Sequence, residues 1–353
     1  MSKLTYKRFT PSGIKKGKDL TNSSRLLISV AEEYGVKWKI INGTQIVILN
    51  YNGKEEAYYH QVPSTTTAIA IYCDNKKITR NLLKQAGVSV ANGYAINKSH
   101  DKKYLLDIFE DLKKPLVVKP SDGTWGENIT IGVSTYEEYS QAVELALSYS
   151  TRKNSGVIIE EMFLGEEYRI LLTKEKVIGV LKRIPANVTG NGKDNIKKLI
   201  ATKNKEELRS SNGVNKSHLK IIINEKLKKY LADQNLDTDA ILKKGQRVFL
   251  KKVSNVSQGG DAIDFTDLVH SSVKEIALKA IRAIPGLSFA GLDFMSTDIT
   301  KEQTKDSYII VEINASPGFD IHDFPYEGKN RHATREFLFL IFPELRHDLS
   351  QIN

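Results

Sequence analysis

Residues 311–318 of the chain read Val-Glu-Ile-Asn-Ala-Ser-Pro-Gly. Glu312 and Asn314 alternate with apolar residues, so in a strand both side chains point to the same face. A second strand-like segment, 290–294, carries Asp293 between apolar neighbours. Two carboxylates and an amide are hard oxygen ligands of the kind that Mg²⁺ prefers, shared with substrate phosphates. The sequence therefore predicts a metal site formed by two strands. For Glu312 alone, an edge strand facing water is the alternative.

A loop that contains two glycines follows the apolar run 116–118. Residues 119–128 read Lys-Pro-Ser-Asp-Gly-Thr-Trp-Gly-Glu-Asn. Backbone N–H groups beside glycine can approach phosphate oxygens, and a lysine ammonium neutralises their charge. Lys119, Ser121, Gly123 and Gly126 are therefore candidate phosphate-binding residues. The alternative is a β-hairpin with a glycine turn and a surface lysine, because the loop matches neither a Walker loop nor a dinucleotide fingerprint.

Residues 158–169 place several carboxylates at the end of another apolar strand. Glu160 and Glu167 could accept hydrogen bonds from an amino group and from ribose hydroxyls. The extended backbone from Glu161 to Phe163 could pair with a purine edge. For any single glutamate here, a charged strand end at the surface is the simpler interpretation.

A fourth group of residues is basic and polar. Arg169 and Arg183 precede Lys251 and the segment 254–260, Ser-Asn-Val-Ser-Gln-Gly-Gly. Arginines beside a glycine backbone can hold a carboxylate and a phosphoryl group in transfer. The candidate catalytic residues are Arg183, Lys251, Asn255, Ser257, Gly259 and Gly260. Surface charge and a turn are the alternative for each residue taken separately. His322 is either a base or a hydrogen-bonded structural residue.

The composition is that of a globular protein, with 353 residues, 40% hydrophobic and 27% charged. It excludes intrinsic disorder and collagen-like repeats. The single cysteine, Cys73, cannot form an internal disulfide or a zinc site with several thiolates, and it indicates a reducing compartment. The apolar run 337–342 is far shorter than the roughly 20 residues of a membrane span. The basic N-terminus has no apolar segment behind it. We therefore expect a cytoplasmic protein that does not bind membranes.

Strands and helices alternate irregularly, which favours an α+β fold over a doubly wound sheet. Three segments are expected: 1–62, 63–155 and 156–353. Residues 184–218 are rich in Asn, Lys and Gly and are expected to contain a mobile loop. Helices are expected at 24–34, 78–86, 272–283 and from a capping box at 134–137 to about 148. Strands are expected at 37–41, 45–50, 116–118, 129–133, 157–160, 168–172, 177–181 and 308–313.

Taken in order, these motifs resemble the ATP-grasp ligases. The resemblance covers about residues 22–345 and is strongest to the ATP-grasp part of cyanophycin synthetase and of the bifunctional glutathione synthetases. It rests on Asn-Lys-Lys-Ile-Thr at 75–79 together with the motifs at 117–129, 158–169, 290–294 and 311–318. The family implies a nucleotide held between two α+β subdomains.

The resemblance also implies roles for individual residues. Lys76 and Lys119 would contact the nucleotide phosphates, and the loop 121–128 would close over them. Glu160 would meet the adenine amino group, the backbone of 161–163 the purine edge, and Glu167 the ribose. Asp293, Glu312 and Asn314 would hold one or two Mg²⁺ ions, for which Mn²⁺ could substitute.

Family chemistry joins a carboxylate to an amine. The acid attacks the γ-phosphorus of ATP, giving an acyl phosphate and ADP, and the amine then displaces phosphate. Arg183, Lys251 and the amides of Gly259 and Gly260 are the candidates for stabilising the transferring group and the oxyanion. We expect a small amino acid or peptide acid as substrate. A γ-glutamyl dipeptide joined to glycine is one alternative, and extension of an aspartyl chain is another.

Three departures from the family pattern matter. Asn128 stands where relatives usually carry a third glycine, and Lys251 where the cyanophycin type has arginine. No counterpart of either relative's second catalytic half is present, so we expect an overall reaction that copies neither. A nucleotide-binding regulatory module without ligation is an alternative. The net charge of +10 fits anionic substrates, and no motif supports a nucleic-acid partner. A homo-oligomer is compatible with the sequence.

Overall fold

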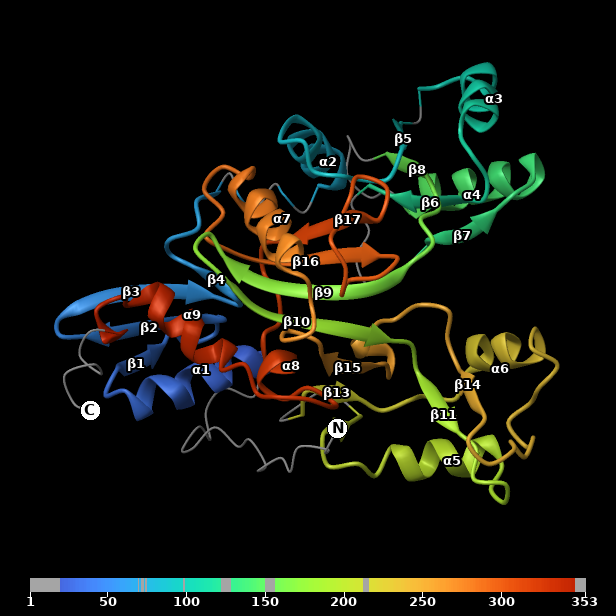
Figure 1. Ribbon diagram of the computed structural model, residues 1–353. Coiled ribbons are helices and arrows are strands. Elements are labelled where there is room, and N and C mark those ends of the chain that lie inside the picture. The colour runs from blue at the N-terminus through green and yellow to red at the C-terminus, as the bar shows by residue number, and fades with distance from the viewer. Residues whose placement is uncertain are drawn as a thin grey trace.

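The computed structural model describes residues 20–68, 70, 73, 75–97, 99–121, 128–149, 156–211 and 216–346, and it has the expected α+β fold (Figure 1). Its helices are α1 (Asn22–Glu33), α2 (Lys76–Gln85), α3 (Lys102–Asp111), α4 (Tyr136–Tyr149), α5 (Ile196–Lys203), α6 (Glu225–Ala232), α7 (Ser271–Arg282), α8 (Asp320–Asp323), α9 (Ala333–Ile341) and the 3₁₀ turn η2 (Val256–Gln258). Its strands are β1 (Lys37–Ile40), β2 (Ile46–Tyr51), β3 (Lys54–Tyr59), β4 (Val62–Pro63), β5 (Gly93–Ile96), β6 (Leu116–Pro120), β7 (Thr130–Val133), β8 (Val157–Glu161), β9 (Glu166–Thr173), β10 (Val177–Ile184), β11 (Asn187–Thr189), β12 (Arg209–Ser210), β13 (His218–Leu219), β14 (Arg247–Phe249), β15 (Asp261–Asp264), β16 (Phe289–Ser296) and β17 (Tyr308–Asn314).

The central sheet has five antiparallel strands in the order β15-β10-β9-β16-β17 (Figure 1). Because side chains alternate along a strand, Ile170, Leu172 and Leu292 point to one face. There they join the buried residues of α7 in a core cluster. The helix predicted at 272–283 is α7 and is confirmed. The single cysteine, Cys73, is buried in the same cluster.

The opposite face of the central sheet is covered at one end by α1 and α9. Leu27 and Ile28 of α1 pack with Phe337 of α9 and with Leu171 and Phe289 of the sheet. The core thus joins the segment predicted as 1–62 to the C-terminal helix. The predicted boundary at residue 62 falls within β4. The three predicted segments, 1–62, 63–155 and 156–353, stay a prediction.

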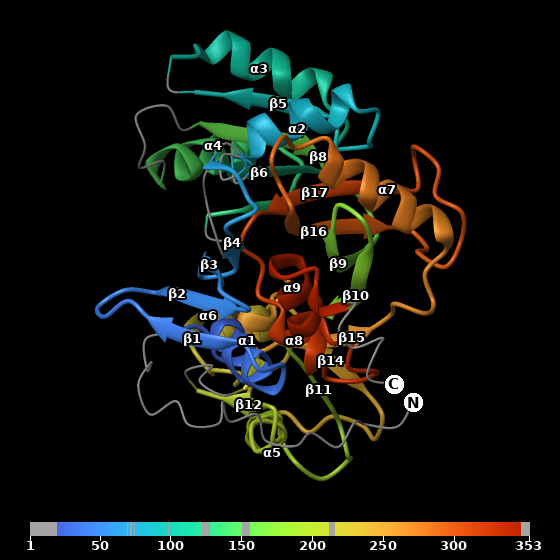
Figure 2. The same cartoon turned by 90° about the vertical axis from the view of Figure 1, so that its left-hand side faces the viewer.

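A second sheet, β5-β8-β6-β7, forms the body that contains α3 and α4 (Figure 2). Val118 and Ile159 face the helices, where Tyr139 and Ala142 of α4 are buried beside them. Lys119 and Glu160 therefore lie on the other face of this sheet. Helix α4 is capped one residue later than predicted. The Thr135 hydroxyl accepts from Glu138 N, and the Glu138 carboxylate accepts from Thr135 N.

The segment predicted to hold a mobile loop is largely ordered. It contains β11, α5 and β12, while residues 212–215 lie outside the described part. One asparagine of this segment is a helix cap, since the Asn195 side chain accepts from Lys198 N at 2.9 Å. The apolar residues of α5 and α6 form a small core of their own with β11 and β14.

Among the described residues, no helix is long and apolar enough to cross a membrane. The apolar run 337–342 forms most of α9 and the residue after it. Its side chains are buried in the core shared with α1.

Candidate functional site

A polar cluster lies on the face of the central sheet opposite α7. Asp293 of β16 pairs in register with Glu312 of β17 on one side and with Arg169 of β9 on the other. The Arg169 guanidinium Nε lies 2.8 Å from the Asp293 carboxylate. Gly291 leaves room for this pair, because a Cβ there would lie 2.6 Å from Arg169 Nη1. The register of three strands thus collects an arginine and two carboxylates.

Arg183 of β10 extends the cluster toward the edge of the sheet. Its Nη1 lies 2.6 Å from Glu167 and 3.4 Å from Asp293. Burial alone would lower the pKa of Arg183, but Asp293 and Glu167 outweigh it and raise the pKa above its usual value. The pKa of Arg169 is lowered mainly by burial and secondly by the nearby positive charge of Arg183. Both arginines lie within ion-pair distance of the Asp293 carboxylate.

Helix α2 connects the central sheet to the second sheet. Lys76, in its first turn, places Nζ 3.2 Å from the Glu312 carboxylate. Its backbone N–H donates to Ser121 O, at the end of β6. The helix begins here because the Asn75 side chain accepts from the N–H groups of Lys77 and Ile78. Helix α2 lies next to β17 and close to the sheet that contains β6 and β8 (Figure 2).

A buried charge pair on the second sheet faces α2. Lys119 Nζ lies 2.6 Å from the Glu160 carboxylate, and the lysine is 4% exposed. Arg80 of α2 bonds the other oxygen of Glu160 and the Gly93 carbonyl. Arg80 was not identified from the sequence. Its position at four residues after Lys76, on the same helix face, was the available signal.

The structure brings several predicted nucleotide-binding residues together and leaves others elsewhere. Lys76, Lys119 and Glu160 lie around α2, and Glu167 lies beside Arg183. The Ser121 hydroxyl accepts from Gly156 N, so it holds the end of β6. Gly123 and Gly126 lie outside the described residues, as does most of the predicted loop 121–128.

The backbone predicted to meet a purine is partly engaged within the protein. Glu161 N donates to Asn92 O and Met162 N donates to Pro115 O, both at 2.9 Å. The Glu161 carboxylate accepts from Asn92 and from the Lys113 N–H. Phe163 is half-buried at the start of the turn that leads into β9.

The three predicted metal ligands share one face of adjacent strands. Asp293 and Glu312 lie opposite each other, and Asn314 is two residues further along β17. The side-chain oxygen of Asn314, Oδ1, accepts from Ser316 N at 2.8 Å. Two carboxylates and an amide oxygen fit Mg²⁺ in chemistry. Within the described ranges, no group of three or more His, Cys, Asp or Glu side chains gathers at one point.

The segment 254–260 adopts a tight turn next to Glu167. The Ser254 hydroxyl donates to the Glu167 carboxylate. Asn255 caps η2, because its side chain accepts from the Ser257 N–H and hydroxyl. Lys251 donates to Gln258 at 3.3 Å, and its pKa is lowered by burial and then by Lys226.

The amides of Gly259 and Gly260, predicted to meet an oxyanion, donate within the turn in this structure, and their role stays a prediction. Gly259 N donates to Val256 O and Gly260 N donates to Asn255 O. The turn closes on itself, so neither N–H is free to meet an oxyanion in this arrangement. The sequence pattern could not reveal this, because it does not specify which carbonyls the turn brings back to these amides.

His322 is fully buried in α8, and neither of its ring nitrogens has a hydrogen-bond partner among the described residues. Burial, and then Arg169 and Arg183, hold the pKa of His322 well below its usual value. It packs so closely on β10 that a Cβ at Gly179 would lie 2.8 Å from its Nδ1. These features favour the structural role for His322, although the sequence had suggested hydrogen bonds that are not present.

No family model matches the chain. The chain is 36% identical over 329 residues to a glutathione biosynthesis bifunctional protein of Clostridium perfringens, covering 92% of the chain and 41% of that protein. It is 33% identical over 325 residues to the cyanophycin synthetase of Geminocystis herdmanii, covering 91% of the chain and 36% of the relative. A bifunctional glutathione synthetase from Pasteurella multocida has a similar structure, with a TM-score of 0.72, 30% identity, and coverage of 92% of the chain and 44% of the other.

The two sheets, the bridging helix and the polar face between them define an ATP-grasp protein. More narrowly, the chain belongs to the ATP-grasp ligase family, together with the matching parts of these relatives. It spans well under half of the length of each of them.

Proposed function

We propose that this chain is an ATP-dependent ligase that joins a small carboxylic acid to an amine through an acyl phosphate. One observation carries the proposal. Asp293 and Glu312 lie opposite each other on one sheet face, flanked by Arg169 and held at the Glu312 tip by Lys76. This combination of acidic oxygens and fixed cations suits a polyphosphate and its metal ions.

The nucleotide would lie between the central sheet and the second sheet, along α2. Lys76 belongs to α2 and Lys119 to β6 of the second sheet. Both lysines are buried, and each is paired with a glutamate. Phosphate oxygens entering there would replace those glutamates as partners of the ammonium groups. Glu160 and Glu167 are proposed for the adenine amino group and the ribose hydroxyls, as in the family.

Asp293, Glu312 and Asn314 are proposed to hold Mg²⁺. When bound, the ions would screen the charge of the phosphates against an approaching carboxylate. Further positive charge beside the phosphoryl group would come from side chains of the protein. Arg169 and Arg183 both lie beside Asp293 and would supply two buried cations beside the transferring group.

The proposed reaction has two steps. An oxygen of the acid attacks the γ-phosphorus, and the bond to the β–γ bridging oxygen breaks, releasing ADP. The amine nitrogen then attacks the acyl carbon, loses a proton, and expels phosphate to leave an amide. Lys251 has a lowered pKa and lies at the edge of the segment 254–260, so it is the candidate proton acceptor or oxyanion partner.

The proposed substrates rest on the charge of the site and on the similarity to known ligases. The buried arginines favour an anionic donor, such as an amino acid or a short peptide acid. The name of the Clostridium relative points to glutathione biosynthesis, which favours a γ-glutamyl dipeptide with glycine as the first pair to test. We propose a cytoplasmic enzyme, in keeping with a nucleotide substrate and one buried cysteine.

The test is a phosphate-release screen of acids against amines, followed by mass spectrometry of the products. ADP and phosphate should form only when both an acid and an amine are present. Formation of AMP and pyrophosphate would refute the acyl-phosphate route. Magnesium-dependent ATP binding without turnover across a broad panel would instead favour a regulatory module, the alternative motivated by Asn128 and Lys251.

A further inference from the structure

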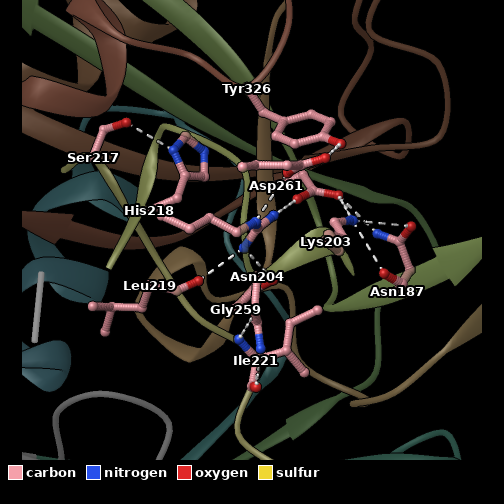
Figure 3. Close-up of polar contacts among 12 residues, drawn as sticks. Asn187, Lys203, Asn204, Ser217, His218, Leu219, Ile221, Gly259, Asp261 and Tyr326 are labelled. Carbon is pink, nitrogen blue, oxygen red and sulfur yellow. Dashed lines mark hydrogen bonds and ion pairs between the residues drawn. The ribbon is translucent and has the colours of Figure 1, made fainter. Parts of the chain in front are cut away.

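A buried charged cluster lies beside the segment 254–260, outside the residues discussed so far (Figure 3). Its centre is Asp261, the first residue of β15, which is 3% exposed. The Asp261 carboxylate accepts hydrogen bonds from the Lys203 ammonium at 2.6 Å and from the Asn187 side-chain amide at 2.9 Å. The Arg209 guanidinium also donates to it. Figure 3 shows Lys203 and Asn187 beside Asp261.

Arg209 makes the most contacts in the cluster. Its side chain is 0% exposed. One terminal nitrogen donates to the carbonyls of Leu219, at 2.8 Å, and Gly259, at 3.1 Å. The other donates to Asp261, and Nε donates to Glu206 at 3.2 Å. A guanidinium can make these contacts at once because its donors form a rigid planar fork, which a lysine ammonium lacks.

The charges of the cluster balance within the cluster itself. Lys203 and Arg209 face Asp261 and Glu206, so each buried charge has an opposite partner. The Tyr326 hydroxyl donates to Glu206, and its ring lies 5.5 Å from the Arg209 guanidinium carbon. A satisfied buried network of this kind specifies a local geometry. It leaves no unpaired charge that would call for a ligand.

A second chain of hydrogen bonds fixes the residue after Asp261. His218 Nε2 accepts from Ala262 N at 3.3 Å, and its Nδ1 contacts the Ser217 hydroxyl at 2.8 Å. That hydroxyl donates to the Phe324 carbonyl, so Nδ1 of His218 carries the proton. The start of β15 is thus held from two sides.

The cluster holds a turn that also touches the candidate site. Gly259 has φ +93°, and a Cβ there would lie 2.8 Å from Ile221 Cγ1. A Cβ at Gly260 would lie 2.7 Å from the carbonyl of Ile184, the residue after Arg183. At its other end the turn begins with Ser254, which donates to Glu167. The turn therefore lies between the buried cluster and the Glu167–Arg183 pair.

We propose that Arg209 is a positioning residue that sets the geometry of the turn 254–260 against Glu167 and Arg183. It does so by bonding the Gly259 carbonyl, the Asp261 carboxylate and the Leu219 carbonyl at once. Through Ser254 the turn contacts Glu167, the proposed ribose partner, and through Gly260 it packs against the residue after Arg183. This inference rests on the proposed function, because it assigns a step to the turn.

The test compares Arg209→Lys with Arg331→Lys in the full chain. Arg331 is a matched control: it is a largely buried arginine that bonds Asp264, at the other end of β15. Both variants keep the charge and lose the fork. Amide hydrogen exchange over 254–262, Mg²⁺-ATP affinity by calorimetry and steady-state kinetics are measured for each.

In Arg209→Lys we expect exchange over 254–262 to rise about tenfold or more. We expect kcat to fall by at least about tenfold, and the Kd for ATP to rise by a smaller factor because Glu167 is the proposed ribose partner. In Arg331→Lys the exchange of this segment and kcat should match the wild type, even if Tm falls equally. Equal exchange and kinetics in the two variants would overturn the proposal.

Two outcomes need separate handling. If Arg209→Lys does not fold, Asp261→Asn provides the same comparison, since it keeps one acceptor oxygen and loses the charge that Arg209 and Lys203 share. If the wild type turns over no acid–amine pair, the proposed function fails. The exchange and ATP-affinity measurements then still decide whether Arg209 holds the turn.

Discussion

Asp293 on β16 lies directly opposite Glu312 on β17, with Arg169 on the strand at its other side. The pairing brings together carboxylates from two separate sequence motifs, at adjacent positions on one sheet face. Like charges opposite each other in a sheet repel. Here Arg169 is paired with Asp293 and Lys76 with Glu312, so each carboxylate has its own cation. The arrangement is suited to binding further cations together with anionic phosphates.

Replacing Glu312 by Gln should abolish most of the turnover and leave the fold intact. Gln keeps the shape but removes the charge that pairs with Lys76 and that a divalent cation requires. We expect kcat to fall by about 100-fold or more, with a weaker response to Mg²⁺. Glu302→Gln, at an exposed position just before β17, is the control. Full activity of Glu312→Gln would remove Glu312 from the proposed metal site.

Replacing Glu160 by Gln should destabilise the protein as well as weaken ATP binding. Glu160 is the ion-pair partner of both Lys119 and Arg80 in a buried setting. Removing one partner of a buried ion pair leaves uncompensated charge, at a cost of about 3–5 kcal/mol. Urea unfolding monitored by circular dichroism measures this cost. Glu161→Gln, the neighbouring residue on the other face of β8, should lose much less, and equal losses would contradict the assignment.

Replacing Gly291 by Ala should impair catalysis through Arg169. A methyl group there would lie 2.6 Å from Arg169 Nη1 and 2.8 Å from Pro317 Cβ. The arginine must move away from Asp293, and overpacking of this kind costs about 1–3 kcal/mol. We expect kcat to fall more than the affinity for ATP does. Kinetics and calorimetry on the same preparation separate the two effects, and an unchanged kcat would show that the Arg169–Asp293 pair does not contribute to turnover.

The stability of the protein should fall in mild acid partly because of His218. Burial, and then Arg209 and Lys203, hold the pKa of His218 well below 6.5 in the folded state. The unfolded chain therefore takes up the proton first as the pH drops below about 6.5, and the free energy of unfolding decreases with falling pH in that window. His218→Gln cannot titrate, so its loss of stability between about pH 7 and pH 5 should be smaller.

Urea titrations of wild type and His218→Gln at several pH values provide the measurement. The difference in unfolding free energy at pH 8, where neither side chain is charged, reports packing and hydrogen bonding alone. Any further change toward acid reports protonation. An identical pH dependence in the two proteins would show that His218 does not titrate as its burial implies.

Several parts of the fold were predictable because they depend on local patterns. The alternation around 157–160, 168–172 and 308–313 indicates strands, and the structure has β8, β9 and β17 there. The spacing of apolar residues in 272–283 indicates a helix, and α7 is found there. Asn195, read as part of a loop, caps α5. A single asparagine fits either interpretation until the packing of the following residues is known.

The sequence alone determined the candidate residues and the order in which they occur, because a strand places Glu312 and Asn314 on one face whatever surrounds it. Only the tertiary structure decided which of these residues meet. Strand order and register place Asp293 between Arg169 and Glu312, and α2 brings Arg80 to Glu160. The turn at 254–260 directs the two glycine amides back onto its own carbonyls. These outcomes depend on contacts between segments distant in the chain, which no local pattern encodes.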